Sequence, residues 1–408
     1  METIHNIEKI RSDFPILSQQ VFGCPMVYFD NAATTHKPLV VIDAISEFYT
    51  KYNANVHRGA HFLSMKASEM FENARSFIAR QINAQHSYEI IFTRGTTESV
   101  NLVASTFGRM HVGKGDEVII SHIEHHSNIV PWQMLCNEKQ AVLRIIPVLD
   151  SGELDFDGFL SLLSSKTKLL AITHVSNSLG TIIPVENYIA EARLRNIPVL
   201  LDGAQAMAHL PVDVQQLGCD FYCFSGHKTY GPTGIGILYG KEEHLQQMPP
   251  WQGGGEMIKD VSFEKTIYND IPFKFEAGTP HVAGAIGLER ALGYLNSIGW
   301  NWICSRENEL LQYLNTQLQS IEGIQIVGTA SDKAPVVSFL IDKIHPYDAG
   351  LILDRLGIAV RTGNHCTQPV MDRFKVPGTI RASLAFYNTH EEIDRLIVAI
   401  EKVKQMLS

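Results

Sequence analysis

The 408-residue sequence has few cysteines, no apolar run of membrane-spanning length and no excess of positive charge. The six cysteines are scattered, which suits a reducing compartment better than a disulfide framework. The longest apolar stretches are interrupted by charge or glycine. A formal net charge of -9 argues against a nucleic-acid surface. The first fifteen residues lack the apolar core of a signal peptide and contain acids that a transit peptide would lack. We therefore expect a cytoplasmic protein with no nucleic-acid or membrane partner.

The chain is long enough for two domains, and its texture changes along its length. Between about residues 60 and 240, compact apolar runs such as "EIIFT", "DEVIIS" and "KLLAITHV" alternate with helical patterns. Strands that are apolar on both faces and separated by helices predict a mostly parallel sheet covered on both sides. Beyond about residue 295 the pattern predicts a smaller α+β unit. We expect a large domain over 16–295 and a small domain formed by 1–15 together with 296–408.

The cysteines differ in their surroundings. Cys219 and Cys223 lie in a strand-like run, where we expect them to share one face of a sheet and to pack in the core. Only Cys366, at the end of "RTGNHC", sits among polar residues and glycine. Whether it serves packing or chemistry depends on the rest of the chain.

Lys228 lies in "FSGHKTYGPTGIGILYG", after an apolar strand and before a glycine-rich run. A lysine in a partly desolvated turn loses proton affinity and can bond covalently to an aldehyde. A solvated lysine in a flexible loop is the alternative. Asp202 ends another predicted strand, with Gln205 three residues later. A carboxylate at this place could hold a pyridine nitrogen protonated, or it could simply cap the next helix.

Two further stretches point to a flat, phosphorylated ligand. In "IIFTRGTTES", Gly95, Thr96 and Thr97 open a helix after a strand, an arrangement that can bind phosphate. In "SHIEHHSNIVPW", His122, His125 and His126 lack the spacing of a metal site, so we expect no metal. Stacking on an aromatic cofactor suits His125 better, with ordinary packing as the competing reading. Together these features indicate pyridoxal phosphate.

These stretches resemble the group II cysteine desulfurases of the SufS/CsdA type, within the class V aminotransferase-like, fold-type I pyridoxal-phosphate enzymes. The resemblance extends over nearly the whole chain, through "NAATTHKP", "NVHRGAH", "RGTTESVNLVA", "EHHSNIVPW", "SNSLGT", "EAGTP" and "RASLAFYNT". It implies an α/β fold whose large domain contains a mostly parallel seven-stranded sheet, with a smaller α+β C-terminal domain that carries the catalytic cysteine loop.

The resemblance also implies roles for single residues. Lys228 would bind the cofactor covalently, and His125 would stack on its ring. Other cofactor contacts would come from Asp202 at the pyridine nitrogen, Gln205 at the phenolic oxygen, Asn177 near the ring, and Thr96, Thr97, Ser225 and His227 at the phosphate. Arg58 and Thr279 would reach across a homodimer interface to the partner's phosphate. The substrate would contact Arg381 through its carboxylate, along with Asn177 and Arg361.

With pyridoxal phosphate bound, Cys366 gains a chemical role. As a thiolate it would take the sulfur atom of L-cysteine and become a persulfide, leaving L-alanine. A short loop implies transfer to an acceptor protein of the SufE or SufU type, for iron–sulfur cluster assembly or other sulfur metabolism. Asn364 and Ser178 differ from residues common in the family, but neither removes a catalytic group.

Three other readings stay open at this point. A selenocysteine lyase would act on L-selenocysteine and could tolerate loss of Cys366. An aminotransferase would keep Lys228 and Asp202 without requiring that cysteine. A sulfur-relay scaffold with a purely structural cofactor is the non-enzymatic reading, and the intact set of Lys228, His125, Cys366 and Arg381 argues against it.

Overall fold

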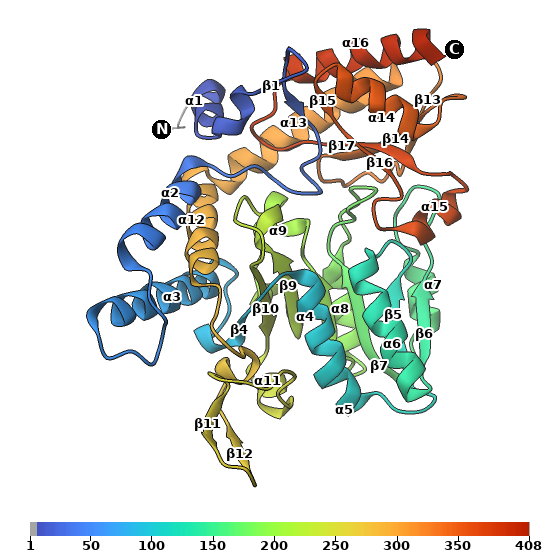
Figure 1. Ribbon diagram of the computed structural model, residues 1–408. Coiled ribbons are helices and arrows are strands. Elements are labelled where there is room, and N and C mark those ends of the chain that lie inside the picture. The colour runs from blue at the N-terminus through green and yellow to red at the C-terminus, as the bar shows by residue number, and fades with distance from the viewer. Residues whose placement is uncertain (1–5, 408) are drawn as a thin grey trace.

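The computed structural model describes residues 6–407, in which a large sheet with helices on both faces adjoins a smaller sheet with its own helices (Figure 1). Residues 1–5, which the sequence assigns to the small domain, lie outside the described residues, as does Ser408. No helix within residues 6–407 is both long and apolar enough to cross a membrane.

The large sheet has seven strands, as expected. Their order is β4 (Ile90–Thr93), β10 (Gly236–Gly240), β9 (Phe221–Ser225), β8 (Val199–Asp202), β7 (Thr167–Thr173), β5 (Glu117–Ser121) and β6 (Val142–Ile146). Only β10 runs against the others, pairing antiparallel with β4 and β9, while β9, β8, β7, β5 and β6 pair in parallel. The prediction of a mostly parallel sheet is confirmed.

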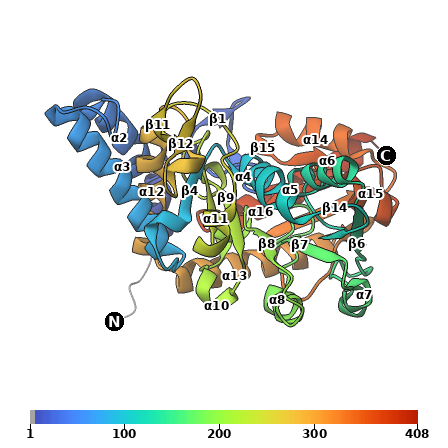
Figure 2. The ribbon, with the colours of Figure 1, turned by 90° about the horizontal axis from the view of Figure 1, so that it is seen from below.

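Helices cover both faces of this sheet (Figure 2). One face carries α4 (Thr96–Val103), α5 (Arg109–His111) and α6 (Val130–Lys139), and the other carries α7 (Phe156–Leu162), α8 (Val185–Arg193) and α10 (Val214–Leu217). Because both faces are covered, successive residues of a strand enter different cores: Ile119 packs in one cluster, and Val118 and Ile120 in the other.

One expectation about the cysteines is wrong. Cys219 and Cys223 are both fully buried, as predicted, but Cys219 precedes β9 and packs in the core on the opposite side from Cys223. The strand begins only at Phe221, so the two-residue alternation of a strand does not extend back to Cys219.

Beyond β4, α12 (Val282–Ile298) packs against α2 (Leu39–Glu47) and α3 (Phe62–Gln81). The amphipathic pattern predicted for α3 is confirmed, because Ala67, Phe71, Ala74 and Ile78 line its buried face. A hairpin of β11 (Ile258–Val261) and β12 (Thr266–Tyr268) projects from the body below α11 (Glu242–Gln247) (Figure 1).

The smaller sheet has the order β13 (Ile324–Val327), β14 (Val336–Ile341), β17 (Thr379–Ser383) and β16 (Arg361–Gly363). Its core includes residues of α13 (Trp300–Gln319), α14 (Pro346–Arg355) and α16 (His390–Leu407). The capping box predicted at the start of α16 is confirmed, because the Glu392 N–H donates to Thr389 Oγ1 and the Thr389 N–H to Glu392 Oε2. Short α15 (Gln368–Phe374) joins β16 to β17.

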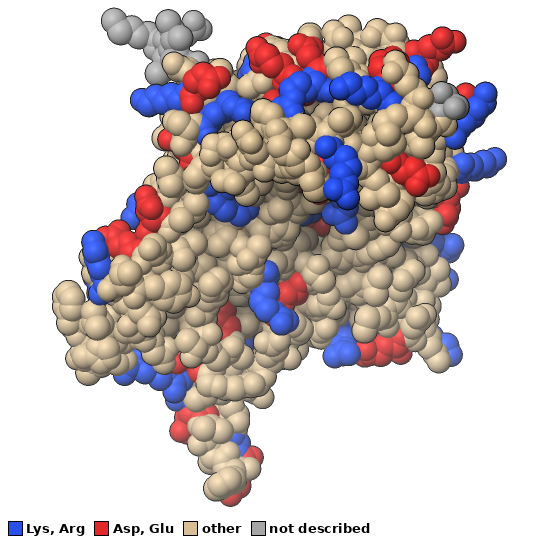
Figure 3. Space-filling view, turned by 45° about the horizontal axis from the view of Figure 1, so that its top comes forward, with Lys and Arg blue, Asp and Glu red and all other residues tan. Residues whose placement is uncertain are grey.

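The N-terminal part of the chain contacts the smaller unit. Arg11 of α1 (Ile7–Ser12) forms an ion pair with Glu392 at 2.8 Å, and β3 (Val27–Tyr28) pairs with β15 (Ile358–Ala359). The domain limits given above stay a prediction. On the face shown in Figure 3, basic and acidic side chains lie side by side along the upper part, so neither sign dominates there.

Candidate active site

A cavity of about 260 Å³ lies at the carboxyl ends of the parallel strands, between the two sheets. Thr173, Asp202 and Ser225 end β7, β8 and β9 and therefore meet at one edge of the large sheet. The small sheet contributes neighbouring β16 and β17. The lining residues are Ala32, Ala33, Thr96, Thr97, His125, Ser127, Thr173, Val175, Asn177, Asp202, Ala204, Gln205, Ser225, His227, Lys228, Arg361, His365 and Arg381.

Lys228 ends the short 3₁₀ turn η6 that follows β9. The turn is fixed through the carbonyl of His227, which accepts hydrogen bonds from Thr34 Oγ1 at 2.9 Å and from Lys37 Nζ at 2.9 Å. Within residues 6–407 no hydrogen bond holds Lys228 Nζ, and desolvation lowers the pKa of the amine to about 8. A neutral amine suited to attack on an aldehyde is therefore accessible near neutral pH.

Asp202 is the acidic residue in the cavity lining given above. Burial raises the pKa of its carboxyl, although the Ala204 N–H bonded to Oδ1 at 2.9 Å and the charge of Lys228 oppose that rise. Gln205 follows, and its Nε2 donates to Ala32 O at 2.7 Å, which fixes the amide and leaves Oε1 as the acceptor. A buried carboxylate that forms no ion pair within residues 6–407 is suited to bind a protonated ring nitrogen.

The start of α4 forms an anion-binding corner of the cavity. Gly95, the N-cap, has φ 152° and provides no side-chain cap for the first turn. A Cβ at this position would lie 3.1 Å from Ser225 Oγ, so a larger residue would crowd the site. The Thr96 N–H donates to Ser225 Oγ at 2.9 Å, and the exposed Thr97 lines the cavity beside it. Uncapped N–H groups and hydroxyls of this kind bind phosphate.

His125 is held as a neutral ring. Its Nδ1 accepts from the Ser127 N–H at 3.1 Å, which places the ring proton on Nε2. Burial and then the charge of Lys228 lower the pKa of His125 to about 3. His122 and His126 do not join it in the cavity, and instead contact the segment around Cys366.

Two arginines reach the cavity from the small sheet, where Arg361 and Arg381 are directly paired across β16 and β17. Arg381 is 1% exposed and donates to Asn177 O at 2.9 Å and to Asp30 Oδ1 at 2.8 Å. Its buried Nε has no hydrogen-bond partner in the described part of the chain. A buried, incompletely satisfied guanidinium beside a second arginine is suited to bind the carboxylate of a small substrate.

Cys366 is half-buried beside the cavity, with its Sγ 3.8 Å from Arg361 Nη2. His365 and Cys366 both have left-handed backbone, with φ of 53° and 59°. For residues other than glycine this conformation is uncommon and persists only where neighbours hold it. The Cys366 N–H donates to Asn364 Oδ1 at 3.1 Å, and Asn177 Nδ2 donates to His365 O at 2.8 Å.

Three predicted site residues do not line the cavity: Cys366, which lies beside the lining residue Arg361, and Arg58 and Thr279. Arg58 is exposed, with its Nε 3.0 Å from Glu256 Oε1. Thr279 is also exposed, and a hydrogen bond of 3.0 Å from the Gly278 N–H to Gly255 O ties its segment to that of Glu256. Both residues therefore sit on one patch of the surface.

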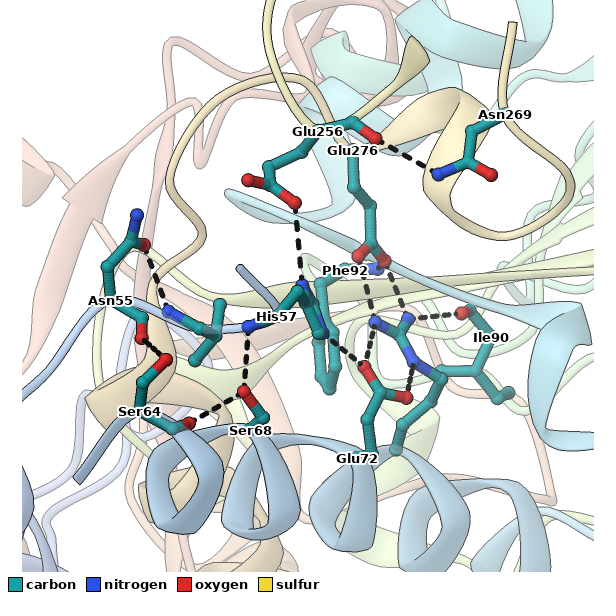
Figure 4. A network of polar contacts seen from close by, with 12 residues as sticks. Asn55, His57, Ser64, Ser68, Glu72, Ile90, Phe92, Glu256, Asn269 and Glu276 are labelled. Carbon is teal, nitrogen blue, oxygen red and sulfur yellow. Dashed lines mark hydrogen bonds and ion pairs between the residues drawn. The ribbon is translucent and has the colours of Figure 1, made fainter. Parts of the chain in front are cut away.

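A buried network supports this patch (Figure 4). Arg75 is 1% exposed and binds both carboxylate oxygens of Glu276, at 2.6 and 2.8 Å, as well as Glu72. His57 Nε2 contacts Glu72 at 3.1 Å and Nδ1 lies 3.7 Å from Glu256. Burial raises the pKa of Glu72, but the His57 hydrogen bond and the Arg75 charge lower it overall to about 2.

Sequence reasoning missed several members of the site. Ser127 fixes the proton of His125, Asp30 pairs with Arg381, and His365 lines the cavity. "NAATT" was part of the resemblance, but no role was given to Ala32 and Ala33, which line the cavity through backbone and methyl groups. Nearness in sequence was the available signal, because Ser127 is two residues from His125, His365 directly precedes Cys366, and Asp30 directly precedes "NAATT".

The residues present fit pyridoxal phosphate. Lys228 has a lowered pKa and no hydrogen bond within the described chain, Asp202 is buried, and the α4 corner has uncapped N–H groups. The neutral ring of His125 lies in the same cavity. Aldehyde, pyridine nitrogen, phosphate and ring face thus each have a matching group.

Comparisons with known proteins agree with this reading. The profile of the family described as aminotransferase class-V matches residues 27–396. A cysteine desulfurase of Escherichia coli K12 is 51% identical over 405 residues, covering 99% of this chain and 100% of that protein. A probable cysteine desulfurase 1 of Mycobacterium leprae is 49% identical over 99% of this chain. This chain spans 66% of the length of that relative, and 59% of a similar one from Mycolicibacterium paratuberculosis.

Solved structures show the same fold. The crystal structure of the cysteine desulfurase CsdA from E. coli, in an S-sulfonic acid form, matches with a TM-score of 0.92 and 38% identity over the whole of both chains. An apo cysteine desulfurase from Thermococcus onnurineus NA1 matches with a TM-score of 0.94, also at 38% identity and full coverage of both chains.

Proposed function

Because the chain belongs to the aminotransferase class-V family and, within it, to the pyridoxal-phosphate-dependent cysteine desulfurases, we propose that it takes sulfur from L-cysteine through Cys366 and leaves L-alanine. The observation that carries this proposal is that Cys366 Sγ lies 3.8 Å from Arg361 Nη2, and Arg361 lines the same cavity as Lys228 and Asp202. An aminotransferase or a cofactor-bearing scaffold would not require a thiol at this place.

Bound pyridoxal phosphate supplies an electron sink for bond changes at the substrate's carbon atoms. Lys228 would hold the cofactor and then, as the free amine, move the proton at the substrate Cα. Asp202 would keep the ring nitrogen protonated, and Gln205 would contact the phenolic oxygen. Thr96, Thr97, Ser225 and His227 would hold the phosphate, with His125 on the ring and Asn177 near it.

Arg381 would bind the substrate carboxylate, since its buried Nε lacks a partner within residues 6–407. Arg361 Nη2, 3.8 Å from Cys366 Sγ, would lie beside the attacking sulfur. The thiolate would attack the substrate sulfur, so that a sulfur–sulfur bond forms as the Cβ–Sγ bond breaks. The carbon fragment would retain that electron pair and take up a proton on the way to alanine.

The protein would act as a homodimer in the cytoplasm. Arg58 and Thr279 lie outside the cavity of their own chain and share an exposed patch, which is the arrangement expected if they complete the partner's phosphate site. The persulfide would pass to an acceptor protein of the SufE or SufU type, for iron–sulfur cluster assembly or another sulfur pathway.

The test is alanine formation from L-cysteine with a thiol reductant, comparing wild type with Cys366→Ala and with Cys24→Ala. Cys24 is also half-buried but lines a separate surface pocket with Leu356 and Ile358, so its variant controls for loss of a thiol in general. We expect only Cys366→Ala to lose alanine and sulfide formation while keeping the cofactor absorbance band. Wild-type rates in that variant would refute the role of Cys366.

A selenocysteine lyase is the second candidate. The relatives reported above are named for cysteine, which favours the desulfurase reading. Parallel assays with L-selenocysteine would separate the two, because a dedicated lyase would act on L-selenocysteine in the Cys366→Ala variant and leave L-cysteine nearly untouched in wild type.

A further inference from the structure

Two histidines that the proposed chemistry does not use hold the segment that carries Cys366. Gln368, the first residue of α15, donates its N–H to His126 Nε2 at 3.1 Å. The next residue, Pro369, accepts at its carbonyl from His122 Nε2 at 3.1 Å. A third bond, 2.9 Å from the backbone N–H of His126 to Cys366 O, joins the same two segments.

The two rings must carry their protons in opposite ways. A carbonyl only accepts, so His122 Nε2 bears hydrogen; a backbone N–H only donates, so His126 Nε2 is bare. The pairing therefore needs one donor and one acceptor at fixed positions. Helix α15 has no side-chain cap, so His126 satisfies one of the N–H groups left free at its start.

The held segment has reason to need support. His365 and Cys366 are consecutive residues in left-handed backbone. Residues other than glycine disfavour this conformation unless neighbours enforce it. On the small-sheet side of the segment, Asn364 accepts from the N–H of Cys366. On the cavity side, Asn177 donates to the carbonyl of His365. The histidines hold the remaining side, from the turn that also presents His125 to the cavity.

We propose that His122 and His126 are positioning residues that clasp residues 366–369 and so keep Cys366 at the mouth of the cavity. This inference rests on the proposed function for its catalytic meaning, although the clasp itself is a property of the folded chain. The turn after β5 thereby positions the ring of His125 in the cavity and also the thiol of Cys366 beside the cavity.

Hydrogen exchange of the cofactor-loaded protein, without substrate, tests the clasp. The Thr367 and Val370 amides bond to Asn364 O at 2.8 Å and Thr367 O at 2.9 Å, so they keep their own acceptors when a histidine is replaced. Faster exchange at these two amides therefore reports opening of the segment rather than loss of one bond. We expect His126→Leu and His122→Leu each to speed it about five- to tenfold, the effect of one lost hydrogen bond.

Conservative variants separate a clasp from general packing. His126→Gln offers an oxygen acceptor and His122→Gln an amide donor, so both should stay within about twofold of wild type. His111→Leu, an exposed histidine outside the cavity lining, should leave the exchange unchanged. In a single turnover, the leucine variants should bind L-cysteine with the wild-type dissociation constant, measured from the change in cofactor absorbance. They should form the persulfide more slowly.

Unchanged exchange at Thr367 and Val370 in both leucine variants would overturn the clasp, as would glutamine variants that behave like the leucine ones. The proposed function can fail separately, through alanine formation by Cys366→Ala, because the exchange measurement involves no turnover.

Discussion

Replacing Arg75 with alanine removes the cation that binds Glu72 and Glu276 in the network of Figure 4. Among residues 6–407, the Glu276 carboxylate, whose side chain is 7% exposed, would keep only the Phe92 N–H at 2.7 Å as a partner. Breaking one side of a buried ion pair costs about 3–5 kcal/mol, because the remaining charge stays desolvated. The guanidinium also lies 4.6 Å from the ring centre of Phe92, a contact whose loss acts in the same direction.

This magnitude can be converted into a melting temperature. An unfolding entropy of about 2.1 cal/mol/K per residue over 408 residues means that ~4 kcal/mol lowers Tm by about 5 °C. Differential scanning calorimetry of the cofactor-loaded protein measures it. The matched control is Arg109→Ala, which breaks an ion pair of 2.9 Å whose partners are 54% and 44% exposed. Exposed pairs contribute below about 1 kcal/mol, so its Tm should fall by about 1 °C or less.

The contribution of the ion pair between Arg75 and Glu276 can be measured separately with Glu276→Gln. Its amide oxygen still accepts from the Phe92 N–H, and no uncompensated carboxylate remains when Arg75 is also absent. The double variant Arg75→Ala/Glu276→Gln should therefore lose less than the two single losses added together. A Tm for Arg75→Ala equal to that of Arg109→Ala, or strict additivity in the double variant, would refute the reasoning.

Three further predictions concern the site. Only the neutral amine of Lys228 reacts with an aldehyde, and its pKa is lowered to about 8, so cofactor uptake by cofactor-free protein should speed up with rising pH and level off above about 8. Stopped-flow absorbance measures this, and a rate still climbing near about pH 10, as for an ordinary lysine, would contradict it. Arg381→Lys loses the planar fork and should raise KM for L-cysteine about 10- to 100-fold with the cofactor band unchanged, which initial-rate kinetics would show; an unchanged KM would remove Arg381 from substrate binding. Glu256→Gln weakens the anchor of Arg58 and should speed cofactor loss on dilution about two- to fivefold, with a rate equal to wild type counting against a role for Arg58 at the phosphate.

The large sheet was predictable because its strands are buried on both faces and read as continuous apolar runs between helices. "EIIFT" and "DEVIIS" became β4 and β5 with boundaries shifted by one residue. The strand containing Cys223 was read two residues too long, which gave the wrong relation to Cys219. Strand ends depend on hydrogen bonds to neighbouring strands, and a single sequence does not contain these.

Local motifs predicted the chemistry of the site, while contacts between distant segments determined its geometry. Lys228 and Asp202 could be identified because Asp202 ends one apolar strand and Lys228 closely follows another, and the carboxyl ends of both strands meet at the cavity. The bond from Gln368 to His126 joins residues that are 242 positions apart, and the pair of Arg75 and Glu276 spans 201. No periodicity links such residues, so only the folded chain reveals them.

The two sheets contribute different parts of the site, and this division has a functional consequence. Of the groups suited to the cofactor, Asp202 ends β8 of the large sheet and Lys228 lies in the turn after β9, whereas Arg381 lies on β17 of the small sheet and Cys366 in the segment between β16 and α15. A small displacement between the sheets would move Cys366 together with Arg381, the residue proposed to bind the substrate carboxylate, and would leave the proposed cofactor contacts intact. The bonds from His122 and His126 to residues 366–369 cross this boundary next to the thiol. Weakening these bonds should therefore slow sulfur transfer before it affects cofactor binding. A substitution at Asp202 should instead weaken cofactor binding first.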